Sequence, residues 1–97
     1  MRVHRWVTQF RKTGDPRLVR GHELRGAKLA RLRTLFEPGA DDPKMYLCYL
    51  LTQKQQPYIE RILGEELDLD TYDYYVEAYS EQGRVSRPRF VAATSNL

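Results

Sequence analysis

The chain has few of the residues that build chemically specialised sites. It contains a single cysteine, Cys48, and two histidines among 97 residues. One cysteine excludes a disulfide within the chain, and a thiol inside the apolar run M-Y-L-C-Y-L-L is typical of a small core side chain. The sequence has no glycine-rich loop of the kind that holds phosphate groups. These absences argue against a disulfide scaffold, a nucleotide-binding loop and cysteine catalysis.

Long hydrophobic stretches are also missing. The N-terminal sequence M-R-V-H-R-W has no apolar core of the kind found in signal peptides. No apolar run approaches the roughly 20 residues that a membrane helix needs. A free thiol agrees with a reducing compartment. We therefore expect a cytoplasmic protein with no membrane partner.

Candidate metal ligands and catalytic groups are scattered. The candidate ligands for a metal ion are the pairs Asp41 with Asp42 and Asp68 with Asp70. The D-L-D spacing lacks the glycine and the terminal glutamate of a calcium loop. Neither histidine lies in a strong acidic pattern. We accordingly expect no metal, no cofactor and no enzymatic activity.

The sequence does have an ordinary apolar content, 41%, and a marked division of charge. A chain of this length suits one domain, which would bury roughly 60–68% of its unfolded surface. Residues 1–36 hold ten Lys and Arg against two acids, a net +8, whereas residues 37–83 hold three against eleven, a net −8. The two halves either neutralise each other after folding or form a dipole that attracts a charged partner.

Loose alternation over residues 2–12 predicts a strand with one aromatic face. That face carries four residues, which are His4, Trp6, Thr8 and Phe10. The turn sequence T-G-D-P follows, and residues 17–24 return as a second strand to complete a hairpin. We expect Trp6 and Phe10 to contribute to the small core.

Two helices follow the hairpin. The first is predicted over residues 27–36, with leucines three or four apart, and the sequence E-P-G ends it. The second follows Thr52, which we expect to be its N-cap with Gln55 as the capping-box partner. Pro57 favours a helix start near residues 55–56, because proline is tolerated only in the first turn.

Two strands complete the predicted fold. The apolar run at residues 44–51 predicts a central strand covered on both faces, and residues 72–80 predict the last main strand. The order is then ββαβαβ, in a single α+β domain at residues 1–83 with a mixed or antiparallel sheet and two helices packed on one face. Residues 84–97 are expected to be a C-terminal tail, either a short edge strand or disordered.

The stretch E-E-L-D-L-D-T-Y-D-Y-Y-V-E-A-Y-S-E, residues 65–81, combines seven acids and four tyrosines without one Lys or Arg. Because side chains alternate along a strand, Tyr75, Glu77 and Tyr79 share a face, which we expect to point outward. Tyrosine supplies rigid contact area, and carboxylates suit a cationic partner. The predicted partner-binding residues are Asp68, Asp70, Tyr72, Asp73, Tyr75, Glu77 and Tyr79. The alternative is that the tyrosines only pack and the acids only aid solubility.

Three motifs over residues 23–77 resemble a family of small bacterial domains often encoded near polymorphic toxin genes. They are E-L-R-G-A-K-L-A-R-L-R-T-L-F, D-D-P-K-M-Y and L-D-L-D-T-Y-D-Y-Y-V-E. The chain departs from the family pattern at Lys44, which separates the D-D-P sequence from Met45. The resemblance implies an immunity protein of the contact-dependent growth inhibition type, which binds one toxin domain and blocks it. It carries over no contact residues.

The sequence therefore predicts an immunity protein that neutralises a cognate basic toxin, of the nuclease type, through the acidic and tyrosine-rich stretch. The alternative is a small nucleic-acid-binding or regulatory protein that uses the arginine-rich N-terminal hairpin. A third hypothesis is a phage-encoded inhibitor of a host defence complex that uses the same acidic face.

Overall fold

The structure, a computed structural model, describes residues 2–85 and confirms the predicted α+β class. The elements in chain order are β1 (Val3–Arg11), β2 (Leu18–Glu23), α1 (Leu29–Phe36), β3 (Tyr49–Leu50), α2 (Gln56–Leu63), β4 (Tyr72–Ser80) and β5 (Gly83–Arg84). The first six elements follow the predicted ββαβαβ order, and β5 is a further two-residue strand. Residues 86–97, which make up most of the predicted tail, lie outside the described residues.

The sheet is antiparallel throughout, and its central strand is β4. The strands lie in the order β2-β1-β4-β3, and β5 pairs with the end of β4. The longest pairing joins β1 to β4, from Val3 opposite Ser80 to Arg11 opposite Tyr72. Both strands are rich in aromatic and β-branched residues, which fit a pleated surface. These two strands therefore set the register of everything around them.

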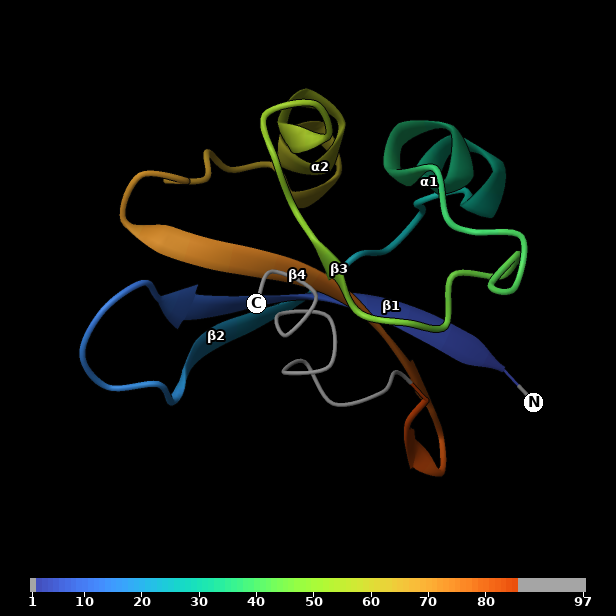
Figure 1. Cartoon of the computed structure of the whole chain (residues 1–97), viewed down its shortest axis with the longest axis horizontal. Coiled ribbons are helices and arrows are strands. Elements are labelled where there is room, and N and C mark those ends of the chain that lie inside the picture. Colours follow the sequence, from blue (N-terminus) through green and yellow to red (C-terminus); the bar gives the residue numbers. More distant parts are fainter. Residues whose placement is uncertain (1, 86–97) are drawn as a thin grey trace.

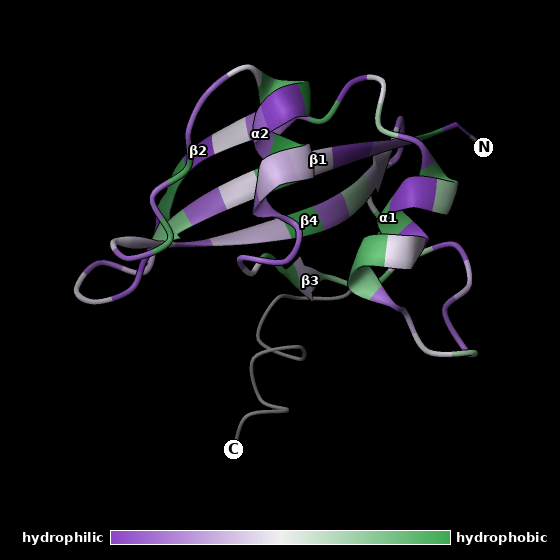
Figure 2. Cartoon of the chain, turned by 90° about the horizontal axis from the view of Figure 1, so that it is seen from above, coloured by the Kyte–Doolittle hydropathy of each residue, from purple (hydrophilic) through white to green (hydrophobic). Residues whose placement is uncertain are grey.

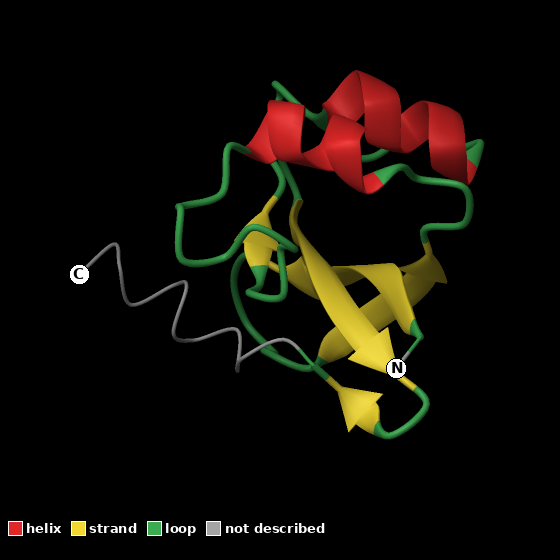
Figure 3. Cartoon of the chain, turned by 90° about the vertical axis from the view of Figure 1, so that its right-hand side faces the viewer, coloured by secondary structure: helices red, strands yellow, loops and turns green. Residues whose placement is uncertain are grey.

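Both helices lie on the same face of the sheet (Figures 1 and 3). The core forms between the two layers and includes Val7, Val76, Leu32 and Ile59, none more than 2% exposed. In Figure 2, hydrophilic and hydrophobic bands alternate along the long strands, as expected for a sheet with two unlike faces. The opposite face of the sheet is covered by neither helix.

The strand register corrects the expectation for the aromatic residues of β1. Val7 lies opposite Val76, and both belong to the core beneath the helices. Trp6 and Phe10 point to the other side, because successive residues of a strand alternate between faces. The expectation that they contribute to the main core is wrong, since Val7 takes that place.

The prediction that residues 44–51 form a central strand is also wrong in extent and in position. Only Tyr49–Leu50 pairs with β4, and it does so at the edge of the sheet. The preceding residues wind around the carboxylate of Asp42, which accepts three hydrogen bonds from this segment. Met45 has φ 54°, a left-handed conformation incompatible with a strand. The apolar run is therefore buried as a loop, with Cys48 5% exposed.

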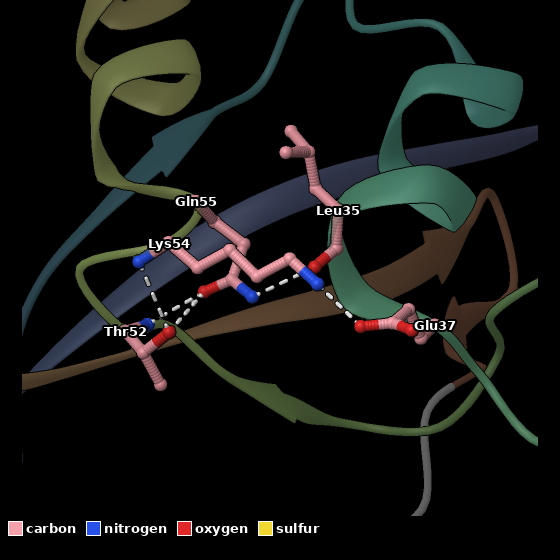
Figure 4. A network of polar contacts seen from close by, with 5 residues as sticks. All are labelled: Leu35, Glu37, Thr52, Lys54 and Gln55. Atoms are coloured by element: carbon pink, nitrogen blue, oxygen red, sulfur yellow. Dashed lines mark hydrogen bonds and ion pairs between the residues drawn. The ribbon is translucent and has the colours of Figure 1, made fainter.

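The two helices are tied together by the turn that precedes α2 (Figure 4). The side-chain oxygen of Gln55 accepts hydrogen bonds from the backbone N–H of Thr52 at 2.7 Å and from its hydroxyl at 2.8 Å. The amide nitrogen of Gln55 donates to the carbonyl of Leu35 in α1 at 2.9 Å, and Lys54 pairs with Glu37. The predicted pairing of Thr52 with Gln55 thus forms, but the N-cap of α2 is Gln55 and not Thr52.

Candidate protein-binding surface

The face of the sheet away from α1 and α2 is named here the open face. Residues directly opposite each other on antiparallel strands share a face, so the register defines its members. They are His4, Trp6, Thr8 and Phe10 from β1, Leu18, Gly21 and Glu23 from β2, Leu50 from β3, and Asp73, Tyr75, Glu77 and Tyr79 from β4. Four of the seven predicted partner-binding residues therefore lie together on this surface.

Two aromatic pairs bridge β1 and β4 on the open face. The rings of Trp6 and Tyr79 lie 6.4 Å apart at 72°, and those of Phe10 and Tyr75 lie 6.0 Å apart at 74°. This edge-to-face geometry is favourable because the positive edge of one ring meets the negative face of the other. The two contacts hold the aromatic side chains of neighbouring strands in fixed orientations.

A polar contact lies between the two aromatic pairs. The hydroxyl of Thr8 donates a hydrogen bond to the carboxylate of Glu77. Tyr75 is 7% exposed and Glu77 is 1% exposed, so the expectation that both would stand outward is wrong. They lie on the predicted face but are buried there, and a buried carboxylate requires hydrogen-bond partners. Asp73 and Tyr79 are only partly buried.

Three predicted partner-binding residues lie elsewhere. Tyr72 is on the helix side, where its ring contacts that of Tyr74 and packs against the core. Asp68 and Asp70 are exposed in the turn that leads into β4. Hydrogen bonds, first from the side chain of Thr71 and then from nearby backbone N–H groups, hold the pKa of Asp68 below its usual value. The negative charge of this turn therefore lies outside the open face.

The open face carries three acids. They are Glu23, Asp73 and Glu77, and the register places Arg84 of β5 opposite Tyr79. Two ion pairs lie at its margins, where Lys12 lies 2.9 Å from Asp73 and Arg25 lies 3.4 Å from Glu23. Three carboxylates thus gather on the side of the sheet that the helices leave uncovered.

A shallow hollow of about 420 Å³ lies on the open face. Its lining residues come from β1, β2 and the end of β4, and are His4, Trp6, Thr8, Leu18, Gly21, Tyr79, Ser80 and Glu81. A Cβ added at Gly21 would be 3.6 Å from the Trp6 ring, so this ring lies directly over the glycine. Leu18 is 54% exposed, the largest exposure among the large hydrophobic residues described.

Sequence reasoning missed the contribution of β2 to this surface. Leu18, Gly21 and Glu23 join the site only through their pairing with β1. The alternation of His4, Trp6 and Phe10 in β1, and that of Tyr75, Glu77 and Tyr79 in β4, are the local signals that identify part of the surface. They did not indicate on which side of the sheet the helices would pack.

The two charged halves of the sequence meet at few points. Between them, the described residues form the pair Lys12 with Asp73 and the pair Arg20 with Glu65, the latter at 3.9 Å. His22 also lies 3.2 Å from Glu65. The exposed residues of α1 include Arg31 and Arg33, on the opposite side of the molecule from the open face. The described ion pairs therefore neutralise only part of the charge of the two halves.

Within residues 2–85, no group of three or more His, Cys, Asp or Glu side chains is placed to hold a metal ion. No helix in the described part of the chain has the length and apolar character to cross a membrane.

Comparison with known proteins gives one result. The model of a family described as a domain of unknown function (DUF7683) matches residues 4–77. The match starts in β1 and ends within β4, so it includes both helices and most of the central pairing. Comparisons with curated proteins and with solved structures found no match.

Proposed function

The chain belongs to the DUF7683 family, and we propose that it is a non-catalytic binding protein whose open face takes a cationic protein partner. One observation carries the proposal. The face that both helices leave uncovered combines two aromatic pairs with the carboxylates of Glu23, Asp73 and Glu77. Aromatic anchors surrounded by complementary charge are the usual composition of a specific protein interface.

The electrostatics support a partner of positive charge. The exposed acids Glu66, Asp68 and Asp70 precede β4 and give the turn before this strand a negative potential. Such potential speeds the encounter with a cationic protein and disfavours anionic ones. The exposed arginines of α1 lie on the far side, where they would not oppose this approach.

The more specific form of the proposal is toxin immunity. The resemblance over residues 23–77 implies a protein that blocks one toxin, and a nuclease toxin has a cationic cleft for phosphate groups. An acidic and aromatic face complements such a cleft in charge. On this proposal the protein neutralises its toxin by covering the cleft.

The test is direct inhibition of the protein encoded by the adjacent upstream gene. The two proteins should purify together, and equimolar mixing should abolish the nuclease or other toxic activity. Leu18→Asp, on the open face, should weaken inhibition at least tenfold, whereas Arg33→Asp on α1 should leave it unchanged. Full toxic activity at equimolar mixing contradicts the proposal.

One observation favours a second candidate, the binding of single-stranded nucleic acid. Trp6 and Phe10 are not used in the main core, and the hairpin end beside them carries Arg11, Lys12 and Arg17. Aromatic rings that stack bases next to cations that contact phosphates form such sites. A gel shift at low salt that weakens steeply as salt rises would support this candidate over the first.

A further inference from the structure

We propose that the hollow on the open face is an anchor site for one apolar side chain, flanked in the partner by Lys or Arg. This inference rests on the proposed function, because it names what the open face recognises in its partner. The hollow lies where β2, β1 and β4 run side by side, which Figure 1 shows as neighbouring strands below the helices.

The floor of the hollow is apolar. Trp6 lies over Gly21, and its ring meets Tyr79 edge-to-face. Leu18 forms one wall and is more than half exposed. Exposure of a large leucine beside the indole ring is unfavourable, because apolar area in water raises the free energy by roughly 25 cal/mol per Å². An apolar side chain placed there would remove this surface from water.

The margin of the hollow is acidic. Glu81 lines it and is exposed, and Glu23 lies beside His4, with 3.5 Å between the carboxylate and the imidazole. The exposed carboxylate of Glu81 next to an apolar floor favours a cation beside the inserted side chain. The recognised segment therefore has an aliphatic or aromatic residue with Lys or Arg next to it.

The hollow contains an intrinsic fluorescent probe for ligand binding. Trp6 is the only tryptophan among the 97 residues, so fluorescence excited in the indole band comes from the hollow alone. Burial of the ring under a ligand side chain should shift its emission to shorter wavelength. Peptides without tryptophan leave this signal free of background.

The experiment selects heptapeptides from a random phage library on the whole chain, then titrates Trp-free synthetic versions against Trp6 emission. Enriched peptides should pair an apolar residue with Lys or Arg and should shift the emission. Leu18→Asp and Gly21→Val should each weaken binding at least tenfold. Gly21→Val is expected to fold, because its Cβ meets the Trp6 ring at an ordinary contact distance while the added methyl groups fill the hollow.

The matched control is Leu50→Asp. Leu50 is 41% exposed and lies on the open face, but does not line the hollow. The selected peptides should bind this variant as they bind the original chain. Equal weakening by Leu50→Asp and Leu18→Asp would overturn the anchor site.

The remaining outcomes separate the anchor from the wider proposal. Basic peptides without an apolar consensus, weakened by Glu81→Lys and by salt but not by Leu18→Asp, overturn the anchor and leave the open face as a cation-binding surface. A failure to enrich any peptide overturns the anchor. If a dT12 oligonucleotide quenches Trp6 while no peptide binds, the anchor and the protein-binding proposal both fail.

Discussion

The carboxylate of Asp42 organises the loop between α1 and β3. It is 7% exposed and accepts hydrogen bonds from the backbone N–H of Tyr46 at 2.8 Å, from that of Leu47 at 3.1 Å and from the hydroxyl of Tyr49. Burial acts to raise the pKa of Asp42, but these bonds and the charge of Arg5 outweigh it, so the pKa is lowered. Burial, together with the bond to Asp42, raises the pKa of Tyr49. The hydrogen bonds to this one side chain thus stabilise a loop where the sequence predicted a strand.

Asp42→Asn should lower the free energy of unfolding at pH 7 by about 1–3 kcal/mol, because part of a buried hydrogen-bond set is lost. The pKa of Asp42 is lower in the folded chain than in the unfolded one, so its contribution is present above roughly pH 4 and is lost as the pH falls through the folded pKa. Urea unfolding between pH 7 and pH 2 measures both effects. The neighbouring Asp41 is exposed, so Asp41→Asn is the control and should change stability by less than about 0.5 kcal/mol. Equal losses in the two variants would contradict this account.

Thr8 and Glu77 give a second test at the residue scale. Thr8 is 4% exposed, and its hydroxyl donates to the Glu77 carboxylate. Thr8→Val keeps the shape and the strand preference but removes this donor, and should cost about 1–3 kcal/mol. Thr8→Ser keeps the hydroxyl and should cost less, as thermal unfolding of the two variants would measure. A Thr8→Val variant as stable as Thr8→Ser would show that the hydrogen bond contributes little.

At the scale of elements, local sequence signals predicted features that depend on neighbouring residues. They did not predict features that depend on contacts with distant parts of the chain. Pro57 in the first turn and Gly64, with φ 74°, mark the start and end of α2 as expected from the sequence. Alternation separated the two faces of β1, but it did not show that Val7, and not Trp6, would face the helices. That choice depends on the register with β4, where Val76 supplies the matching core residue.

The link between the helices gives a test at this scale. Gln55 is 6% exposed and uses both ends of its amide, one within its own turn and one on the carbonyl of Leu35 (Figure 4). Gln55→Ala should lower the free energy of unfolding by about 1–3 kcal/mol and speed amide exchange at the end of α1. Gln53 is exposed in the same turn, so Gln53→Ala should do neither. Unchanged exchange in Gln55→Ala would mean that the helices are held by the core alone.

At the scale of the whole molecule, the division of charge along the sequence corresponds to a difference in charge between two sides of the fold. The open face and the turn before β4 carry acids, whereas Arg31 and Arg33 are exposed on α1. Composition predicted two charged halves, but the sequence did not reveal which acids would be buried. Glu77 is the clearest case, because it is 1% exposed although it lies on the side of the sheet that the helices leave uncovered.

The effect of a charge reversal on the rate of association with the partner should therefore depend on which side of the molecule carries the substitution. Glu81→Lys, at the margin of the hollow, should slow association up to about tenfold at low salt, and the difference should fade as salt shortens the range of the field. Glu77 is unsuitable for this test, because reversal of a buried charge would destabilise the fold. Arg33→Glu, on the far side, should not slow association. Stopped-flow mixing at two salt concentrations measures these rates, and equal slowing by both variants would argue against a sided field.

The most direct measurement of the central claim is site-specific photo-crosslinking to the protein encoded by the upstream gene. A photoreactive residue is placed at Leu18 on the open face or at Arg33 on α1, and each variant is irradiated with that protein at equimolar concentration. The open-face account predicts a crosslinked product from position 18 and none from position 33. A product from position 33 alone, or from neither position, would contradict it.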